Sequence, residues 1–528
     1  MPKYKSYGSR VKLRKRLAIL AIGAICSGAS TTSNSFAMSD KAACLAARAD
    51  QQVKVTVSPK WAEPGKPFEG WGTALAWFAN VTGRLPSAQR DRLADLLYGE
   101  NGLRFNIARY NIGGGNAPEQ KAYLRSGANI SGFWKRPAGA SGNDWWNPDD
   151  PSQWDWLADP GQRWWLDAIR ERVPREDQIF EAFSNSPPYF MTVSGRVSGN
   201  VDGLTDNLLP GNEGIFADYL VRVAAELEQR HQIHFRTLSP VNEPNTPYWY
   251  ASNTQEGAHW SPARQAKIIT AVAKALRDRG LTTTLSAMDE TNAQTFVEDW
   301  AGLDQAAIDT IDQINVHSYD TTGKTAVRDI AQATGKRLWM SEVDLSPPNV
   351  PQAFDDMRPA IALGEQIVSD INRLRPVGWV LWQAIENEAK PPSSGSDWGL
   401  IKMNYDNTTA PQVHITTKYW SMANFSRFIR PGDRFIPVDD TDTVVALRPD
   451  NRTVVMVHVN PGLYSRHLFL NLPSLDAGWT YRVSTTVTDA THQAENLCNA
   501  CTFDSGGLVA PPKSVTTFVL RPVGVELR

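Results

Sequence analysis

Cysteine and histidine are scarce in this chain, and no charge of one sign dominates it. Among 528 residues there are four Cys and eight His, and the formal net charge is −2. The His are scattered without the paired spacing of a zinc site, and no GxxxxGK[ST] phosphate-binding pattern occurs. Without a basic excess, the chain has no electrostatic footprint for nucleic acid. We therefore expect no metal, no other cofactor and no nucleic-acid partner.

Long apolar runs are also missing beyond the N-terminus, where a basic segment comes first. Lys and Arg residues up to Arg16 precede the apolar run Leu17–Cys26, and small residues follow as far as Ala37. This run is shorter than the roughly 20 residues that span a bilayer, and the order is typical of a cleaved signal peptide. We expect cleavage after Ala37 and a secreted or periplasmic mature protein with no membrane segment. An uncleaved signal anchor is the alternative.

The few cysteines bear on the same question. Cys26 lies in the expected signal peptide, so the mature chain keeps Cys44, Cys498 and Cys501. An oxidising compartment allows one disulfide among these three. The isolated Cys498-Asn-Ala-Cys501 motif favours a structural bridge over a redox or zinc site, because no second ligand pair accompanies it. A bridge from Cys44 to one of the other two would also fit, and the sequence leaves the pairing open.

From residue 65 to 405, short apolar runs alternate with amphipathic segments. One such segment, residues 215–227, repeats apolar residues at helical spacing. Eight strand–helix units predict a (β/α)8 TIM barrel, whose chemistry lies at the C-terminal ends of its strands. The expected strands are Phe68–Ala79, Arg104–Gly113, Gln178–Phe183, Thr237–Val241, Thr284–Met288, Gln313–Ser318, Arg337–Glu342 and Trp379–Ala384.

The segments around the barrel have other patterns. Residues 406–528 predict a C-terminal antiparallel β-sandwich, because short alternating runs are separated by turn signals such as Pro449-Asp450-Asn451. Residues 38–64 include the alternating run Val53–Val57, which we expect to add a strand to that side domain. Residues 115–175 are irregular and predict a long loop after the second barrel strand. The expected sandwich strands are Thr443–Leu447, Thr453–Val459, His467–Leu472, Tyr481–Val487 and Ser514–Leu520.

Two carboxylates carry the clearest chemical signal. Glu243 and Glu342 each follow a short apolar run that indicates a buried strand, where a charge is costly to desolvate. The fourth and seventh strands of a barrel lie across its mouth, so the two carboxylates can face one substrate. Glycosidic bond hydrolysis needs this arrangement, and we expect the carboxyl groups to lie about 5 Å apart. Their proximity would raise the pKa of one of them and keep an acid protonated near neutrality.

Five motifs surround these residues in a characteristic order. They are Phe68-Glu-Gly-Trp-Gly72, Ile107-Ala-Arg-Tyr-Asn-Ile-Gly-Gly-Gly115, Ser184-Asn-Ser-Pro-Pro-Tyr-Phe-Met191, Pro240-Val-Asn-Glu-Pro-Asn245 and Trp339-Met-Ser-Glu-Val343. Together they resemble glycoside hydrolase family 30, and within it the endo-β-1,6-galactanases, from about residue 53 to the C-terminus. The resemblance implies a retaining hydrolase that acts on a polysaccharide or oligosaccharide, with β-1,6-galactan side chains of arabinogalactan favoured. We expect it to work as a monomer.

The resemblance also implies roles for single residues. Glu243 would be the general acid/base and Glu342 the nucleophile that forms a glycosyl-enzyme. Asn242 would hydrogen-bond the sugar 2-hydroxyl, a contact that strengthens in the transition state. Arg109 would pair with the nucleophile and hold it ionised.

Further candidates come from the same strand ends. His317 and Tyr319 would orient the nucleophile or the sugar, and Trp382 would form a stacking floor. The chain has nineteen Trp, a number that fits sugar stacking and core packing equally. Weaker subsite candidates, for which packing is an equal interpretation, are Trp71, Asn111, Tyr189, Trp249 and Glu290.

Fewer residues bear on the identity of the substrate than on the reaction. In the glucuronoxylan-specific relatives an Arg after the eighth strand holds the acid branch, whereas residues 386–398 contain no Arg. Glu386 and Glu388 would repel a uronate, although Lys390 keeps that possibility open. The alternatives are another β-glycosidase of the family, acting on β-1,6-glucan, xylan or a glucosylceramide-like substrate, and a carbohydrate-binding barrel that does not hydrolyse. The intact catalytic carboxylates argue against the last.

Overall fold

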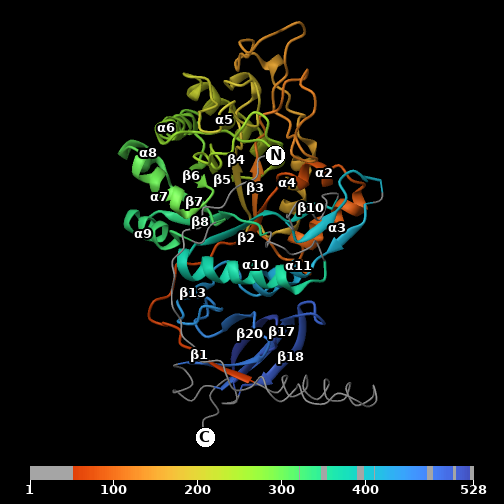
Figure 1. The fold of residues 1–528 in the computed structure, drawn as a ribbon, viewed down its shortest axis with the longest axis vertical. Coiled ribbons are helices and arrows are strands. Elements are labelled where there is room, and N and C mark those ends of the chain that lie inside the picture. The colour runs from red at the N-terminus through yellow and green to blue at the C-terminus, as the bar shows by residue number, and fades with distance from the viewer. Residues whose placement is uncertain are drawn as a thin grey trace, which may run out of the picture. The chain divides into compact units, whose positions relative to one another are not determined.

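The computed structural model describes residues 52–319, 322–345, 354–388, 398–409, 411–472, 480–503 and 507–523. The expected signal peptide, Cys44 and Lys390 lie outside these ranges. From Gln52 onward the chain forms one compact unit, drawn in Figure 1. Among the described residues, no helix has both the length and the apolar character needed to cross a membrane.

Eight parallel strands close into a barrel in sequence order, from β2 to β9. All eight coincide with expected strands, and the TIM barrel is confirmed. Most of their residues are buried on both faces, between the packed barrel interior and the surrounding helices. The strands are β2 (Gly70–Ala74), β3 (Ile107–Asn111), β4 (Ile179–Phe183), β5 (Phe235–Ser239), β6 (Thr284–Glu290), β7 (Gln313–His317), β8 (Arg337–Glu342) and β9 (Gly378–Gln383).

Four of the helices, α4, α7, α8 and α10, begin where an Asp or Asn side chain caps a free backbone amide. Asn292 accepts from Thr295 N at 2.9 Å at the start of α7, and Asp304 accepts from Ala307 N at 2.8 Å at the start of α8. The apolar stripe of α5 is buried except for Ile215, which is 41% exposed. The helices are α2 (Phe78–Thr82), α3 (Ser87–Tyr98), α4 (Pro160–Arg172), α5 (Glu213–His231), α6 (Pro262–Asp278), α7 (Ala293–Gly302), α8 (Gln305–Thr310), α9 (Lys324–Thr334), α10 (Met357–Ser369) and α11 (Thr417–Ser426), with one π-helical turn, η3 (Asp370–Leu374).

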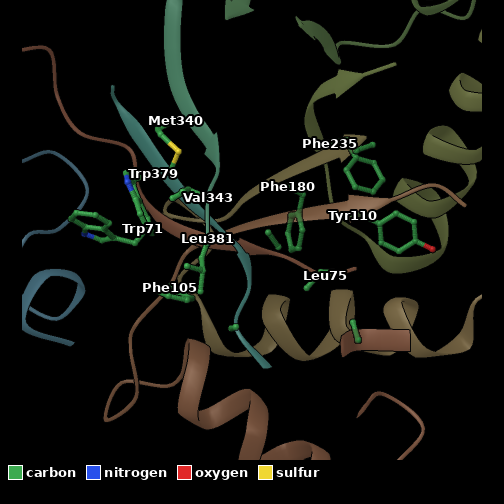
Figure 2. Packing of buried hydrophobic residues seen from close by; sticks show 14 of the residues in the cluster. Trp71, Leu75, Phe105, Tyr110, Phe180, Phe235, Met340, Val343, Trp379 and Leu381 are labelled. Carbon is green, nitrogen blue, oxygen red and sulfur yellow. The ribbon is translucent and has the colours of Figure 1, made fainter. Parts of the chain in front are cut away.

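Trp71 belongs to the core of this assembly. Its indole is fully buried, donates from Nε1 to Ile429 O at 2.8 Å, and lies 5.9 Å from the ring of Trp379. Figure 2 shows these two rings side by side among the buried apolar residues. The structure therefore favours the packing interpretation of Trp71 over a substrate subsite, because its ring and its N–H group are used in core contacts.

The long loop after β3 is ordered by aromatic packing. It ends earlier than expected, at Asp159, because α4 begins at Pro160. Its regular structure among residues 115–159 is one 3₁₀ turn, η1 (Pro151–Gln153). Trp154 stacks on Trp156 with ring centroids 4.5 Å apart, and aromatic contacts of this kind hold a loop that has few backbone hydrogen bonds of its own.

The C-terminal domain consists of two sheets, as the alternating pattern indicated. Five strands lie where expected, whereas β13 is short and β18 is almost entirely exposed, so neither carries a buried alternation. The six-stranded antiparallel sheet has the order β13-β14-β15-β20-β17-β18, and the other sheet has the order β1-β16-β19. The strands are β1 (Gln52–Val57), β13 (Arg434–Ile436), β14 (Thr443–Leu447), β15 (Val454–Asn460), β16 (Ser465–Leu470), β17 (Thr480–Thr488), β18 (Glu495–Thr502), β19 (Leu508–Ala510) and β20 (Ser514–Val523).

The barrel and this domain share a core. Along β15, Val454 and Met456 face the second sheet, while Val455, Val457 and Val459 face the barrel side and join its large apolar cluster. Helices α10 and α11 lie between the barrel and β15, β17 and β20 (Figure 1). A strand that is buried on both faces therefore joins the domain to the barrel.

A small third sheet follows the barrel. Its strands are β10 (Ile385–Asn387), β11 (Ile401–Met403) and β12 (Val413–Ile415), in that order. The expected boundary at residue 405 falls between β11 and β12, so the strands on either side of it pair with each other.

One disulfide joins Cys498 to Cys501 within β18. The hypothesis of a bridge from Cys44 to either residue is therefore wrong. On the partner strand β17, Val483 and Thr485 are opposite Cys501 and Cys498, so β18 carries one extra residue between the paired positions. This β-bulge brings the two Cys together, with their Cα atoms 6.0 Å apart.

Candidate active site

A cavity of about 540 Å³ lies at the C-terminal ends of the barrel strands, where barrel chemistry is expected. It holds both predicted catalytic carboxylates. Its lining comes from the segments that follow β2, β4, β5, β6 and β7, from the C-terminal ends of β8 and β9, and from the segment before β11. The lining residues are Trp77, Asn185, Asn242, Glu243, Tyr248, Tyr250, Ser252, Asn253, Gln255, Glu256, Thr291, Tyr319, Glu342, Trp382 and Trp398.

The two carboxylates lie close together around an imidazole. One oxygen of Glu243, one oxygen of Glu342 and a ring nitrogen of His317 all lie within 4.8 Å of one another. His317 Nδ1 is 3.4 Å from Glu243 Oε1 and 3.6 Å from Glu342 Oε1. Glu342 is the last residue of β8, whereas Glu243 follows the end of β5 by four residues, in a turn and not in the strand.

The turn holds Glu243 in an unusual backbone conformation. Its φ angle is 47°, in the left-handed region that non-glycine residues rarely occupy. Its N–H donates to Asp289 O at 2.8 Å, and Trp249 Nε1 donates to its carbonyl at 2.8 Å. Tyr248 OH donates to its carboxylate. Trp249 is thus a buried support for Glu243 and does not line the cavity, which favours the packing interpretation over a substrate contact.

Arg109 lies beneath the pair, fully buried on β3. Its Nε is 2.7 Å from Glu181 Oε1 and its Nη2 is 2.8 Å from Asp289 Oδ1. Its Nη1 is 3.5 Å from Glu342 Oε2, the longest of the three ion pairs. The predicted pairing with Glu342 therefore exists but is secondary, and the buried guanidinium has no surface on which to bind a substrate.

The charged groups of this cluster shift one another's pKa values. Burial raises the pKa of Glu342 to about 7, a rise that His317 opposes, Glu243 reinforces and Arg109 opposes. Burial lowers the pKa of His317, but the charge of Glu342 and contacts with Asp289 and Glu243 outweigh burial and raise it to about 9. Burial would also raise the pKa of Asp289, but Arg109 and His317 hold it below its usual range. The imidazole is therefore a cation near neutral pH, and the expected ionisation of Glu342 is incomplete there.

The same three side chains could be considered as metal ligands, because three protein donors are the usual set of a catalytic zinc. A metal-bound imidazole must be neutral, whereas three carboxylates surround His317 and favour its protonated form. With this proton in place, Glu243, His317 and Glu342 form a buried acid–base cluster.

Three further predicted residues line the cavity or border it. Asn242 is 4% exposed, and its Oδ1 has no hydrogen-bond partner among the described residues, so it is available to a ligand. Tyr319 donates from its hydroxyl to Glu342 Oε1 at 3.0 Å, and its ring is 39% exposed. Trp382 lies edge-on to Trp77 with ring centroids 5.1 Å apart, and the two indoles form an aromatic corner of the cavity.

Asn111, Tyr189 and Glu290 do not line the cavity. Asn111 is fully buried and donates from Nδ2 to Glu256 Oε2 at 3.2 Å. The Tyr189 hydroxyl accepts from Arg136, and its ring packs on aromatic neighbours. Glu290 is buried and accepts from a backbone amide. These contacts favour packing or support, the alternative interpretation of all three residues, and their predicted subsite roles stay predictions.

Several lining residues are not among the site residues predicted from the sequence. Trp77 and Asn185 directly follow β2 and β4, so the rule that barrel chemistry lies at strand ends could have identified them. Tyr248, Glu256 and Trp398 lie in loops, and no local pattern indicates that their side chains enter the cavity.

Comparison with known proteins agrees with this geometry. Residues 53–329 match the model described as O-Glycosyl hydrolase family 30. An endo-beta-1,6-galactanase of Hypocrea rufa is 30% identical over 436 residues, which cover 79% of this chain and 82% of that protein. An exo-beta-1,6-galactobiohydrolase of Bifidobacterium longum is 29% identical over 538 residues, covering 80% of this chain. The chain spans only about a third of the length of that relative, 35%.

A solved structure extends the likeness to the whole fold. The catalytic domain of the GH30 xylanase C from Talaromyces cellulolyticus has a TM-score of 0.65 to this chain at 19% identity. The superposition covers 88% of this chain and 100% of that domain. At this identity the likeness concerns the fold alone.

Replacing Arg109 by Met tests the buried cluster. Removing one partner of a buried ion pair leaves uncompensated charge, so we expect the free energy of unfolding at pH 7 to fall by about 3–5 kcal/mol, measured by urea denaturation. The pKa of Asp289 is lowered in the folded state, so its contribution to stability is present above its unfolded pKa of about 3.9 and is lost as the pH falls. The difference between the variant and the wild type should therefore shrink at pH 3. A difference independent of pH would contradict this electrostatic account.

Proposed function

The chain belongs to O-glycosyl hydrolase family 30, and we propose that it is a retaining hydrolase that cleaves β-1,6-galactan. The observation that carries the proposal is the approach of the two carboxylates in the cavity, with one oxygen of each within 4.8 Å of the other. Retaining glycosidases have carboxyl groups about 5–5.5 Å apart, whereas inverting enzymes need about 6.5–9.5 Å to admit a water molecule. The short separation therefore supports double displacement.

In this mechanism Glu342 attacks the anomeric carbon while Glu243 gives its proton to the leaving oxygen. The glycosidic C–O bond breaks as the bond to Glu342 forms, and the aglycone departs with the proton. Glu243 then removes a proton from water, and the water oxygen displaces Glu342. Each step inverts the anomeric carbon, so the product keeps the configuration of the substrate.

The surroundings of the two carboxylates support this assignment. Glu342 is next to two cations, Arg109 at 3.5 Å and His317 at 3.6 Å, and accepts a hydrogen bond from Tyr319. These neighbours favour the ionised nucleophile against the burial that raises its pKa. Glu243 lies next to Asn242, whose free amide oxygen can accept from a sugar hydroxyl.

The favoured sugar comes from the relatives. The Hypocrea and Bifidobacterium proteins are both named for action on β-1,6-linked galactose. The Hypocrea enzyme is the one whose length this chain largely spans, at 82%, so we favour endo cleavage. The basic, apolar and small-residue order of the first 37 residues supports secretion, which would bring the enzyme to an extracellular polysaccharide.

A substrate panel tests the proposal directly. Incubated with β-1,6-galactan, β-1,6-glucan, glucuronoxylan and an aryl β-galactoside, the enzyme should release short β-1,6-galacto-oligomers, and proton NMR should detect the β-anomer first. Cleavage of another polymer alone would overturn the galactanase proposal. Binding without cleavage would favour a carbohydrate-binding barrel, and initial release of the α-anomer would contradict retention.

Removing the Glu243 carboxyl separates its role from that of Glu342. In Glu243→Ala, kcat/KM for galactan should fall about 10²–10⁴-fold, the usual contribution of general acid catalysis. An aryl galactoside with a dinitrophenyl leaving group needs no proton, so its first chemical step should fall much less. Glu342→Gln is the matched control, because loss of the nucleophile should affect both substrates. If Glu243→Ala lost as much activity towards the aryl galactoside as towards galactan, as Glu342→Gln should, the separate roles would be refuted.

The pH profile depends on the ionisation of Glu342. Because attack needs the carboxylate and its pKa in the unliganded enzyme is about 7, kcat/KM should rise with pH through an inflection near pH 7. His317 lowers the pKa of Glu342, so His317→Gln should move this inflection upward by about 1–3 pH units. Thermal melting at each pH checks that the variant is folded. An inflection at the same pH in both proteins would show that Glu342 does not control the rate.

A further inference from the structure

Glu256 is a buried carboxyl in the wall of the catalytic cavity. It is 2% exposed and lines the cavity with Gln255 and Asn185. It comes from the loop between β5 and α6, the loop that also carries Tyr248. In the double displacement described above it has no part, because Glu243 and Glu342 supply both carboxyl groups.

Its position relative to Glu243 is fixed by Trp249. The indole N–H of Trp249 donates to the Glu243 carbonyl, and its six-membered ring lies against Gly257, where an added Cβ would be 2.0 Å from Cε3. Only glycine fits under this ring. The loop is therefore folded back so that Glu256 and Glu243 face the same cavity.

Two donors hold the Glu256 carboxyl from behind. Asn111 Nδ2 donates to Oε2 at 3.2 Å, and Gly114 N donates to Oε1 at 3.3 Å. Gly114 has no room for a Cβ, which would be 2.6 Å from Pro187 O, so its bare amide can approach the carboxyl. Both contacts fix the carboxyl plane on the side away from the cavity.

No cation neutralises this carboxyl among the residues that the structure describes. Burial raises the pKa of Glu256 to about 8, although Asn111 and the amides of Gly115 and Gly114 lower it. The carboxyl is therefore mostly protonated at neutral pH. Asn111 Nδ2 and the Gly114 amide both donate to the carboxyl, so neither contact accepts its proton. A neutral O–H group beside a cavity remains for a ligand oxygen.

We propose that Glu256 is a substrate-binding residue that hydrogen-bonds a hydroxyl of a galactosyl unit at the cleavage site. This inference rests on the proposed function, because it assumes that the cavity binds the sugar chain. A sugar hydroxyl both donates and accepts, and a site built to hydrogen-bond such a group rejects analogues that lack it, because its buried polar atoms would be left unpaired. Glu256 would therefore contribute to sugar discrimination.

The test combines variants with modified ligands. In Glu256→Ala, the KM for β-1,6-galactobiose should rise about 10-fold, and so should the inhibition constant of the same disaccharide used as a competing ligand. The kcat should change little, because the contact is made in the ground state and the transition state alike. Asp159→Asn is the matched control. Asp159 is another buried carboxyl, linked to Asn111 through Gln162, but it does not line the cavity. It should lower the melting temperature and leave KM within about twofold.

A set of monodeoxy galactobioses then separates contact from support. The analogue that lacks the contacted hydroxyl should bind about 10-fold more weakly to the wild type but no more weakly to Glu256→Ala, since each change removes the same interaction. Additive effects for every analogue would overturn the proposal and leave a supporting role. If the wild type cleaves a different β-glycoside of the panel, the proposed function fails, and the deoxy series of that sugar decides the role of Glu256 by the same criterion.

Discussion

The buried guanidinium of Arg109 is the interaction on which the rest of the site depends. It joins β3 to β4, β6 and β8 through Glu181, Asp289 and Glu342. A single cation cannot neutralise three carboxylates, and removing charges from water is costly unless each is paired or hydrogen-bonded. The protonated His317 supplies a second positive charge, and hydroxyl and amide groups from neighbouring strands complete the shell. The barrel interior at this end is therefore a network in which two cations and many hydrogen bonds together compensate for three carboxylates.

Asp289 transmits this order to both catalytic residues. Its carboxylate accepts from Ser341 Oγ at 2.6 Å, beside Glu342, and also from Ser239 at the end of β5. Its carbonyl accepts from the N–H of Glu243. One residue thus fixes the strand that ends at Glu342, the proposed nucleophile, and the turn that holds Glu243, the proposed acid. These buried contacts, and not the loops around the cavity, set the short distance between the two carboxylates.

The parts that could be predicted from sequence are those with a local signal. Apolar runs gave all eight barrel strands, and Glu243 and Glu342 were visible because charged residues rarely follow such runs. Trp71 and Trp249 misled because the same indole serves a core or a sugar, and only burial decides between the two. The incomplete ionisation of Glu342 was not predicted, for another reason. Its pKa depends on burial and on four charged neighbours from separate strands, a sum that no local pattern contains.

The positions of loop residues in the proposed sugar-binding wall of the cavity are equally hard to predict from sequence. Glu256 follows Glu243 by thirteen positions in a segment without periodicity, and it enters the cavity only because Trp249 folds that segment back over Gly257. The family fixes the reaction through residues on rigid strands, whereas the cavity wall is built from loops whose course depends on packing between distant segments. The reaction and the sugar specificity can therefore be predicted from the sequence to different degrees. The first follows from strand ends, and the second needs the positions of side chains such as Trp77, Glu256 and Trp398.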